Sequence, residues 1–235
     1  MQDFLQKTVL DFFLPNQCVI CKSINKFNLC SKCLSSIPNS PTMWIRGNQS
    51  SQNLFIPKSK TIIQPLRENY LDNILSCTYF KNNIIRKSIH YLKYKNLPQI
   101  SSPLASIMLR TLSQHLRIRD NIILCPVPLH SNRLKFRGYN QSLLLAEYLE
   151  SKLHIPIYDG LYRIRDTPNQ MKISDKSTRI KNMNNAFEVK YNLPINKANI
   201  ILIDDVTTTL STINQAAKAF QKQSYNSINA LVLAH

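Results

Sequence analysis

Glycine is scarce in this sequence of 235 residues. The chain contains three glycines, where average usage would give roughly 16. Lysine, asparagine and isoleucine are abundant instead, as a genome rich in AT codons would produce. The scarcity bears on function, because loops that bind phosphate normally use glycine for their tight turns.

Acidic residues are also few. The 13 aspartates and glutamates stand against 30 lysines and arginines, which gives a formal net charge of +17. This balance favours polyanionic partners, namely nucleic acid, phosphorylated substrates or an anionic membrane face. The alternative is that codon bias has enriched surface lysine, since the charge is spread along the chain and forms no single tail. With 43% hydrophobic and 18% charged residues, the chain has the composition of a globular protein with a buried core.

Long apolar runs are missing as well. No stretch reaches the roughly 18 uncharged apolar residues that a membrane-spanning helix needs. Segment 1–15 is apolar but interrupted by charges, and it has no basic region of the kind that opens a signal peptide. Leu5, Val9 and Phe12 fall on one helical face, which predicts a short amphipathic helix that packs on the body. We therefore expect a cytoplasmic protein without a membrane span.

Four of the six cysteines are arranged as two CxxC pairs, with Cys18 and Cys21 in the first and Cys30 and Cys33 in the second. Two residues between thiolates let both sulfurs reach one metal ion at about 2.3 Å, so the pattern predicts a tetrahedral Zn²⁺ site. Four thiolates leave no open coordination position, and the zinc would then be structural.

Two disulfides or a redox-active pair are the alternatives to zinc. A reducing cytosol argues against disulfides, and a redox pair does not explain why there are two CxxC pairs. The glycine that often follows such a pair is replaced by Lys22 and Leu34. Cys77 and Cys125 lie in apolar surroundings and are predicted to be inert, buried thiols.

Three regions are predicted along the chain. Residues 1–40 would hold the N-terminal helix and the four-cysteine zinc module. Segment 41–70 mixes proline with serine, asparagine and glutamine and has no sustained periodicity, so we expect a linker. Residues 71–235 would form the main domain.

The apolar pattern of the main domain predicts strands that alternate with helices. Continuous apolar runs predict strands at 75–80, 122–128, 199–206 and 228–234. Stripes with helical spacing predict helices at 84–92, 104–112, 141–153 and 213–220. Residues 163–185 are polar and basic, with little signal of either kind. The alternation indicates an α/β domain with a parallel sheet flanked by helices.

Segment 200–213, IILIDDVTTTLSTI, carries the strongest functional signal. An apolar strand ends in Asp204 and Asp205 and continues through hydroxylated residues into a helix. The N–H groups at the start of such a helix would face an anion. The two acids lie at the strand's carboxyl end, where α/β sheets bind ligands, and could hold sugar hydroxyls or orient Mg²⁺. The alternative is a strand end with a capping aspartate.

This segment resembles the phosphoribosyl-pyrophosphate (PRPP) motif of type I phosphoribosyltransferases. The shared pattern is four apolar residues, two acids, one apolar residue and a threonine-rich turn. The resemblance implies catalytic-site contacts from Asp204 and Asp205 to the ribose hydroxyls. It implies a 5′-phosphate loop made of Thr208, Thr209, Leu210, Ser211 and Thr212. Leu210 stands where the family usually has glycine, and its Cβ could obstruct the turn, so the loop either closes with altered geometry or binds PRPP poorly.

A second segment, 125–149, narrows the resemblance to the ComF family. It is similar to that family's VP…RGxNQ…LA block, which implies a basic loop that binds pyrophosphate. The residues that would supply charge, the turn, and contacts to phosphate or the following helix are Arg133, Lys135, Arg137, Gly138, Asn140 and Gln141. A basic solvated loop is the alternative.

A third segment, 163–189, resembles the family's R…Q…R…N…AF block, the mobile hood that closes over a phosphoribosyl substrate. The matching residues are Arg163, Gln170, Arg179, Asn182 and Phe187. Arg179 would bind phosphate, since closure of a basic lid excludes water and neutralises developing charge. The stretch LKYKN (92–96) is like the family's LKxxG, with Asn96 in place of glycine.

The resemblance covers almost the whole chain and implies a type I phosphoribosyltransferase-like sheet joined to the zinc module. An active protein would bind PRPP with Mg²⁺ and displace pyrophosphate from the anomeric carbon through an oxocarbenium-like state. Positioning and electrostatics would supply most of the catalysis.

ComF proteins are associated with natural competence and with the handling of incoming single-stranded DNA. A surface that binds single strands needs basic residues interleaved with aromatics. The nearest match is formed by Phe80, Arg86, Lys87, Tyr91, Lys93, Tyr94 and Lys95. Three hypotheses stay open: a PRPP-dependent transferase, a nucleic-acid-binding accessory protein with a vestigial PRPP loop, and a structural zinc protein that docks other competence proteins.

Overall fold

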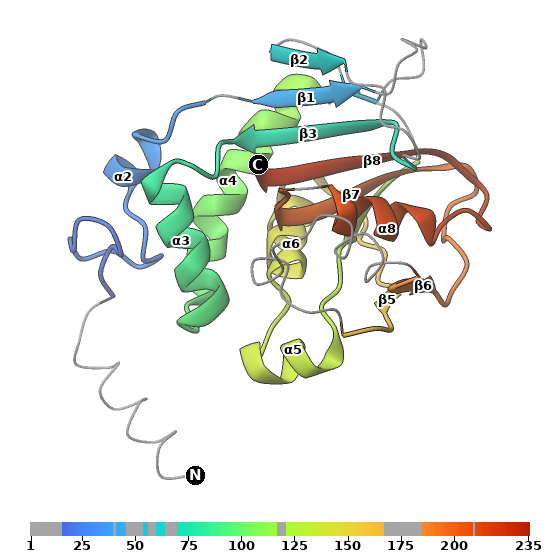
Figure 1. The fold of residues 1–235 in the computed structure, drawn as a ribbon. Coiled ribbons are helices and arrows are strands. Elements are labelled where there is room, and N and C mark those ends of the chain that lie inside the picture. Colours follow the sequence, from blue (N-terminus) through green and yellow to red (C-terminus); the bar gives the residue numbers. More distant parts are fainter. Residues whose placement is uncertain are drawn as a thin grey trace.

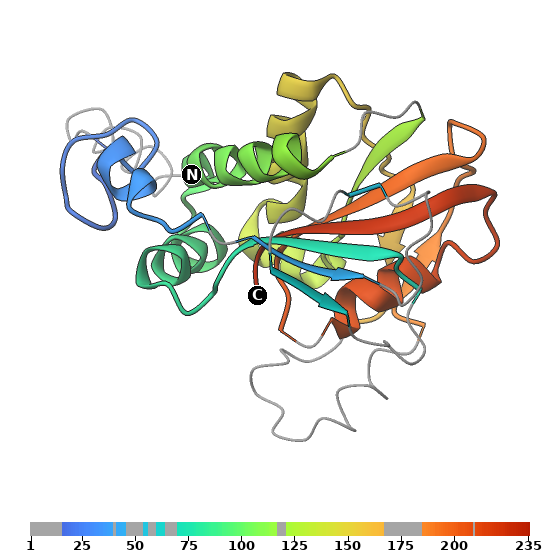
Figure 2. The same ribbon diagram turned by 90° about the horizontal axis from the view of Figure 1, so that it is seen from above.

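The computed structural model describes residues 16–39, 41–45, 54–55, 60–63, 70–116, 121–166, 185–208 and 210–235. Within these residues the chain folds around one mainly parallel sheet with helices on both of its faces (Figures 1 and 2). The helix expected in 1–15 lies outside the described residues, as do Thr209 and Arg179. The predicted α/β class with a parallel sheet is confirmed.

The sheet has six strands in the order β2-β1-β3-β8-β7-β4. They are β1 (Thr42–Ile45), β2 (Lys60–Ile63), β3 (Asn73–Thr78), β4 (Ile122–Pro126), β7 (Ala198–Val206) and β8 (Tyr225–Ala234). The four strands β3, β8, β7 and β4 pair in parallel, and β1 pairs antiparallel with β3. The residues of these parallel strands are buried almost without interruption, because both faces of the sheet are covered.

Strands β1 and β2 lie in segment 41–70, where the sequence predicts a linker. They pair in parallel with each other and extend the sheet beyond β3. These four-residue strands therefore belong to the body of the protein, although the limits of the three predicted regions stay a prediction.

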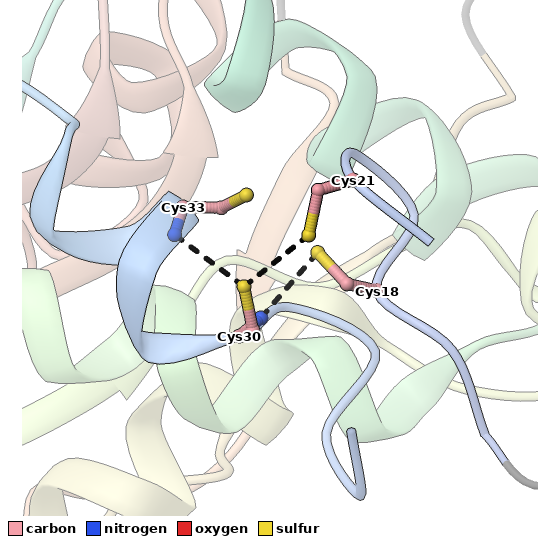
Figure 3. A group of neighbouring side chains, drawn as sticks. All are labelled: Cys18, Cys21, Cys30 and Cys33. Carbon is pink, nitrogen blue, oxygen red and sulfur yellow. Dashed lines mark hydrogen bonds between the residues drawn. The ribbon is translucent and has the colours of Figure 1, made fainter. Parts of the chain in front are cut away.

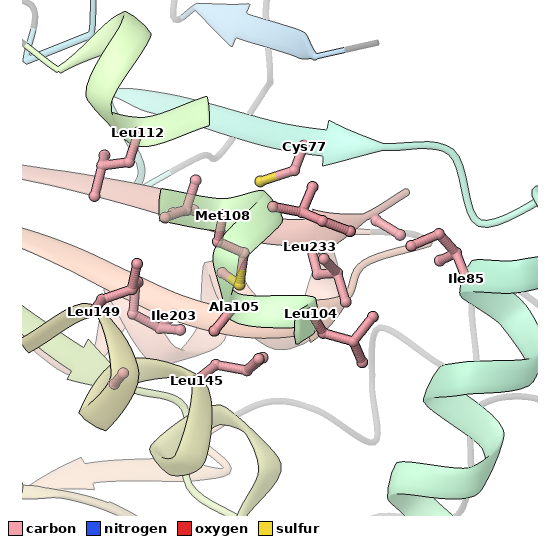
Figure 4. Packing of buried hydrophobic residues seen from close by; sticks show 14 of the residues in the cluster. Cys77, Ile85, Leu104, Ala105, Met108, Leu112, Leu145, Leu149, Ile203 and Leu233 are labelled. Carbon is pink, nitrogen blue, oxygen red and sulfur yellow. The ribbon is translucent and has the colours of Figure 1, made fainter. Parts of the chain in front are cut away.

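Two apolar clusters fill the two faces of the sheet. On one face, α3 (Asn83–Tyr94), α4 (Ser101–His115) and α6 (Gln141–Leu153) pack on the strands. Leu104 and Met108 of α4 meet Leu145 of α6, Ile203 of β7 and Leu233 of β8 in this cluster (Figure 4). A short 3-10 turn, η1 (Pro98–Ile100), separates α3 from α4. The helices predicted at 84–92, 104–112 and 141–153 are therefore confirmed.

On the opposite face lies α8 (Ser211–Lys218), with Ile213 and Phe220 in the second cluster (Figure 2). The same cluster includes residues of a separate antiparallel pair, β5 (Leu161–Arg163) and β6 (Phe187–Val189). Residues 167–184, between these two strands, include most of the predicted hood and lie outside the described part.

The four-cysteine segment packs against the face that carries α3 and α4. Its short helix α2 (Ser31–Ser35) follows Cys30. The buried residues Cys18, Val19, Leu29 and Ile37 belong to the same cluster as the core of α4. Cys77 and Cys125 are buried, as predicted. None of the helices in the described part of the chain combines the length and the apolar surface that crossing a membrane requires.

Candidate functional site

A cleft of about 510 Å³ opens at the carboxyl ends of β7 and β4. Its walls also include the end of α3, the start of α6, the start of α8 and the helix α5 (Ser131–Arg137). Seven of the residues predicted to contact ribose or phosphate line it, namely Asp204, Asp205, Thr208, Thr212, Arg133, Arg137 and Gln141. The structure therefore brings together two sequence segments that were predicted to act on one ligand.

Opposite charges meet in this cleft. Its basic residues are Lys93, Arg133, Arg137 and Arg163. Its acidic residues are Asp166, Asp204 and Asp205. Asp166 is engaged by its neighbours, since its carboxylate accepts a hydrogen bond from Asn132 and lies 3.6 Å from the Arg133 Nε. The cleft can hold an anion beside a group that donates hydrogen bonds to carboxylates.

The acid pair is held rigidly at the end of β7. Oδ1 of Asp204 accepts hydrogen bonds from the Ser142 hydroxyl at 3.0 Å and from the backbone N–H of Asp205 at 2.9 Å. Oδ1 of Asp205 accepts from the N–H of Val206 at 2.7 Å, and its Oδ2 lies 2.8 Å from Nζ of Lys93. Asp205 is buried, whereas Asp204 is partly exposed.

Loss of water around its carboxyl group and the neighbouring charge of Asp205 raise the pKa of Asp204 to about 7. Lys93 and the hydrogen bonds that Asp204 accepts oppose this rise. Arg163 also lines the cleft, and burial and the charge of Arg133 lower its pKa to about 10. Asp204 can thus carry or release a proton near neutral pH, so its charge depends on what enters the cleft.

Leu210 stands where the resemblance leads one to expect a glycine, between β7 and α8. Leu210 adopts the left-handed conformation, with a φ of +58°, immediately before α8 begins at Ser211. Its side chain packs against the cluster that includes Ile213. Leucine at this position takes the backbone conformation that glycine takes most easily. Leu210 and Ser211 shape the turn and do not line the cleft, within the described residues.

Segment 125–149 is predicted to run from a strand through a basic loop into a helix, and this prediction is wrong for Ser131–Arg137, which form the helix α5 (Figure 1). The helix buries none of its residues and stands at the cleft mouth. It ends at Gly138, whose φ of +83° is the left-handed conformation that suits glycine. Helix α6 begins directly after Asn140, whose side chain accepts a hydrogen bond from the N–H of Ser142.

Arg137 joins three elements around the cleft. Its Nη1 donates to Oε1 of Gln141 at 2.5 Å, and its guanidinium lies 5.5 Å from the ring centre of Tyr94. Gln141 is buried, and its Nε2 has no hydrogen-bond acceptor among the described residues. Gly138 and Asn140 set the backbone of this corner and do not themselves line the cleft, as far as the structure describes it.

A second candidate site is a cysteine cluster, which consists of all four predicted metal ligands (Figure 3). The sulfurs of Cys18, Cys21, Cys30 and Cys33 lie within 4.8 Å of one another. Four sulfurs about 2.3 Å from a tetrahedral Zn²⁺ would be about 3.8 Å apart, and Cys21 and Cys30 are separated by 3.6 Å. The four cysteines are therefore positioned to bind a metal ion.

Two local features support this cluster. Hydrogen bonds with Ser23 lower the pKa of Cys21 to about 6, which favours the thiolate that metals bind. Lys22, which stands where a glycine often follows the first pair, has a φ of +65°. Leu34, after the second pair, lies within α2 and needs no such turn.

Comparison with known proteins shows that the chain is similar to proteins named for competence and for DNA utilization. No family model matches it. It is 33% identical to Competence protein F of Haemophilus influenzae over 155 residues, which are 62% of this chain and 66% of that protein. It is 28% identical to Competence protein ComFC of Bacillus subtilis over 169 residues (72% and 67%). It is 26% identical to the DNA utilization protein YhgH of Escherichia coli strain K12 over 214 residues (87% and 90%). The chain belongs to the ComF family.

Three of the cleft residues that the sequence did not indicate as site residues of this ComF-family chain are Lys93, Ser142 and Phe136. Lys93 was considered only for a DNA-binding surface, although it contacts Asp205. Ser142 carries no sequence signal beyond its place after Asn140, and no predicted motif includes Phe136 as a contact, although Phe136 lines the cleft and is 85% exposed. An apolar residue between Lys135 and Arg137 in a segment without apolar periodicity is the signal that could have revealed Phe136.

Proposed function

We propose that the cleft binds the phosphoribosyl group of PRPP, and that residues 71–235 form a type I phosphoribosyltransferase-like domain. One observation carries the proposal: the acid pair that ends β7 shares a cleft with hydroxyl groups at the start of α8 and with Arg137. Carboxylates accept hydrogen bonds from ribose hydroxyls, whereas hydroxyl and guanidinium groups donate to phosphate.

In this proposal Asp204 and Asp205 bind the ribose hydroxyls, and the 5′-phosphate lies at the start of α8. Its donors are the hydroxyls of Thr208, Thr209, Ser211 and Thr212 and the N–H groups of the turn at Leu210. The pyrophosphate lies against the corner formed by Arg137, Gly138, Asn140 and Gln141, and Arg179 of the hood closes over it. Mg²⁺ would be carried by the pyrophosphate oxygens and would neutralise part of their charge.

The reaction breaks the bond between the anomeric carbon and pyrophosphate and forms a bond from that carbon to an acceptor. The cleft residues would orient the two groups and stabilise the charge that develops on pyrophosphate. We further infer that the cysteine cluster holds structural Zn²⁺ and that the protein works in the reducing cytoplasm, where thiolates persist. Because the relatives are named for competence and DNA utilization, we propose a role in handling incoming DNA.

Calorimetric titration of PRPP with Mg²⁺ tests the proposal. Wild type should bind, and Asp205→Asn should lose at least about tenfold in affinity, because a charged hydrogen-bond acceptor contributes about 1.5–3 kcal/mol. Glu188→Gln is the control, since this exposed carboxylate on β6 lies outside the cleft. Folded, zinc-loaded wild type that gives no heat would contradict the proposal, as would equal binding by Asp205→Asn.

A second candidate function, binding of single-stranded DNA with the PRPP loop vestigial, is favoured by Phe136. This side chain is 85% exposed at the cleft mouth. Tyr94 is also exposed and lies under the Arg137 guanidinium. Phe80 and Tyr91 of the surface expected from sequence are partly buried against the core instead. A DNA surface would therefore centre on Tyr94 and Phe136, as aromatic platforms among basic residues.

Fluorescence anisotropy with a labelled single-stranded oligonucleotide at several salt concentrations tests this candidate. Phe136→Ala should weaken binding at least about fivefold if a base stacks on the ring. Tyr191→Ala removes another well exposed aromatic, one outside the cleft, and should leave binding unchanged. Equal losses in both variants, or affinity that does not fall with salt, would argue for a third role, in which the zinc protein docks other competence proteins.

A further inference from the structure

The acid pair already has a positively charged partner, because Lys93 contacts Asp205. Nζ of Lys93 lies 2.8 Å from Oδ2 of Asp205, and the two side chains are 22% and 6% exposed. Oδ1 of Asp205 already accepts from the N–H of Val206. Among the described residues no hydrogen-bond donor pairs with Oδ2 in good geometry, so the ammonium is the group that compensates this buried oxygen.

The position of Lys93 is fixed by its helix. Lys93 lies in the last turn of α3, directly after Leu92, which is fully buried. The carbonyl of Leu92 accepts a hydrogen bond from the Tyr139 hydroxyl at 2.6 Å, which ties the end of α3 to the corner before α6. The neighbouring Tyr94 lies against Arg137. The contacts of Leu92 and Tyr94, on either side of Lys93 in the sequence, therefore fix the backbone that carries the lysine next to Asp205.

A paired acid site normally gains compensating charge from a metal ion or from a basic side chain. Mg²⁺ bound to Oδ2 of Asp205 at about 2.1 Å would bring its double charge within a few ångströms of the ammonium. In a partly buried cleft such repulsion is poorly screened. Metal and ammonium thus compete for one oxygen.

We propose that Lys93 is the resident counter-ion of Asp205 and excludes a protein-bound divalent cation from the acid pair. The acid pair then binds the hydroxyl groups of a ligand, and any Mg²⁺ is bound by the phosphate oxygens of that ligand. The exclusion of metal follows from the contacts of Lys93 and does not depend on which ligand binds. The recognition of the sugar rests on the proposed function. Lys93 is accordingly a positioning residue that decides what the two acids can bind.

Binding of Mn²⁺ to the zinc-loaded protein, followed by the electron paramagnetic resonance signal of free Mn²⁺, tests the exclusion. Mn²⁺ uses the same oxygen ligands as Mg²⁺. Lys93→Met keeps the length of the side chain and removes its charge, and it should gain one Mn²⁺ site at least about tenfold tighter than any in wild type. The gain should vanish in Lys93→Met/Asp205→Asn.

Two controls separate this local effect from a change of net charge or of fold. Lys95→Met removes the same charge two residues further on, from an exposed position outside the cleft, and should bind Mn²⁺ like wild type. Lys93→Arg keeps the charge and should also exclude Mn²⁺. The proposal is overturned if Lys93→Met gains no site, or if wild type already has a Mn²⁺ site that Asp205→Asn removes.

A second measurement needs no variant of Lys93. Ribose 5-phosphate, which lacks pyrophosphate, should bind wild type with an affinity that added Mg²⁺ changes by less than about twofold, because no metal is needed at the pair. Binding that strengthens tenfold with Mg²⁺ would overturn the proposal. If ribose 5-phosphate does not bind at all, the proposed function fails, while the Mn²⁺ result still decides the role of Lys93.

Discussion

The hydroxyl of Ser142 donates a hydrogen bond to Oδ1 of Asp204 over 3.0 Å, between residues 62 positions apart in the chain. Ser142 is buried in the first turn of α6, and Asp204 lies near the carboxyl end of β7. The bond joins the segment that resembles a pyrophosphate loop to the segment that resembles a PRPP loop. It also acts on the charge of Asp204, because a hydrogen bond to a carboxylate favours the ionised form.

Ser142→Ala should therefore raise the pKa of Asp204 above its present value of about 7. Loss of one hydrogen bond to a charged acceptor predicts a rise of roughly one pH unit. A ¹³C NMR titration of the aspartate carboxyl groups measures it. Ser151→Ala is the matched control on the same helix, since its exposed hydroxyl bonds to the carbonyl of Tyr148. An unchanged or lower value in Ser142→Ala would show that this bond does not stabilise the carboxylate.

The raised pKa of Asp204 predicts the pH dependence of stability. The unfolded chain releases this proton near pH 4, whereas the folded protein keeps it until about pH 7. Between these values the folded state binds more protons, so this group makes the free energy of unfolding fall as pH rises from about 4 to about 7, and the loss then levels off.

Asp204→Asn removes that contribution. The stability of this variant relative to wild type should rise between pH 5 and pH 8, as measured by urea unfolding at each pH. A difference that stays constant over this range would mean that Asp204 titrates alike in the folded and unfolded states.

Leu210 provides a test of backbone conformation. Its φ of +58° is costly for any residue with a Cβ. Leu210→Gly and Leu210→Ala both lose the packing of the leucine side chain, so comparing them isolates the backbone. We expect Leu210→Gly to be more stable than Leu210→Ala by about 1 kcal/mol in urea unfolding.

The same pair of substitutions at Gln215, within α8, should give the opposite order. In a helix interior alanine is favoured over glycine by about 1 kcal/mol. If alanine is favoured at both positions, the turn before α8 does not hold a left-handed residue in solution.

Much of the fold was predictable because local patterns and burial agree. The apolar run 200–203 lies between covered faces of the sheet, so its hydrophobicity directly reports its position. The stripes of α3 and α4 likewise match their buried faces. Helix α5 could not be predicted in this way, because it buries no residue. It depends on a cap at His130, a turn at Gly138 and the contacts of Asp166, which lies far along the chain.

The candidate site was predictable in its residue types but not in its pairings. The acid pair and the threonine-rich turn form one continuous motif, so their proximity was evident from sequence. The contacts of Lys93 with Asp205 and of Ser142 with Asp204 arise only when α3, α6 and β7 pack together. Nothing within LKYKN distinguishes Lys93 from its neighbour Lys95, since the direction of each side chain is set by the burial of Leu92.

The cysteine cluster gives a last prediction, because the same residues serve the candidate metal site and the core. Cys18 and Cys33 are buried, and the cluster they join includes residues of α3 and α4. We expect one Zn²⁺ per chain by mass spectrometry of the purified protein. Cys30→Ser should lose the metal and lower the free energy of unfolding by several kcal/mol, because metal binding energy contributes directly to folding. Cys77→Ala removes a buried thiol that is not one of the four clustered cysteines, so this variant should keep the zinc although it leaves a cavity. If Cys30→Ser keeps one zinc and full stability, the four sulfurs do not share a metal ion, and their proximity would reflect packing alone.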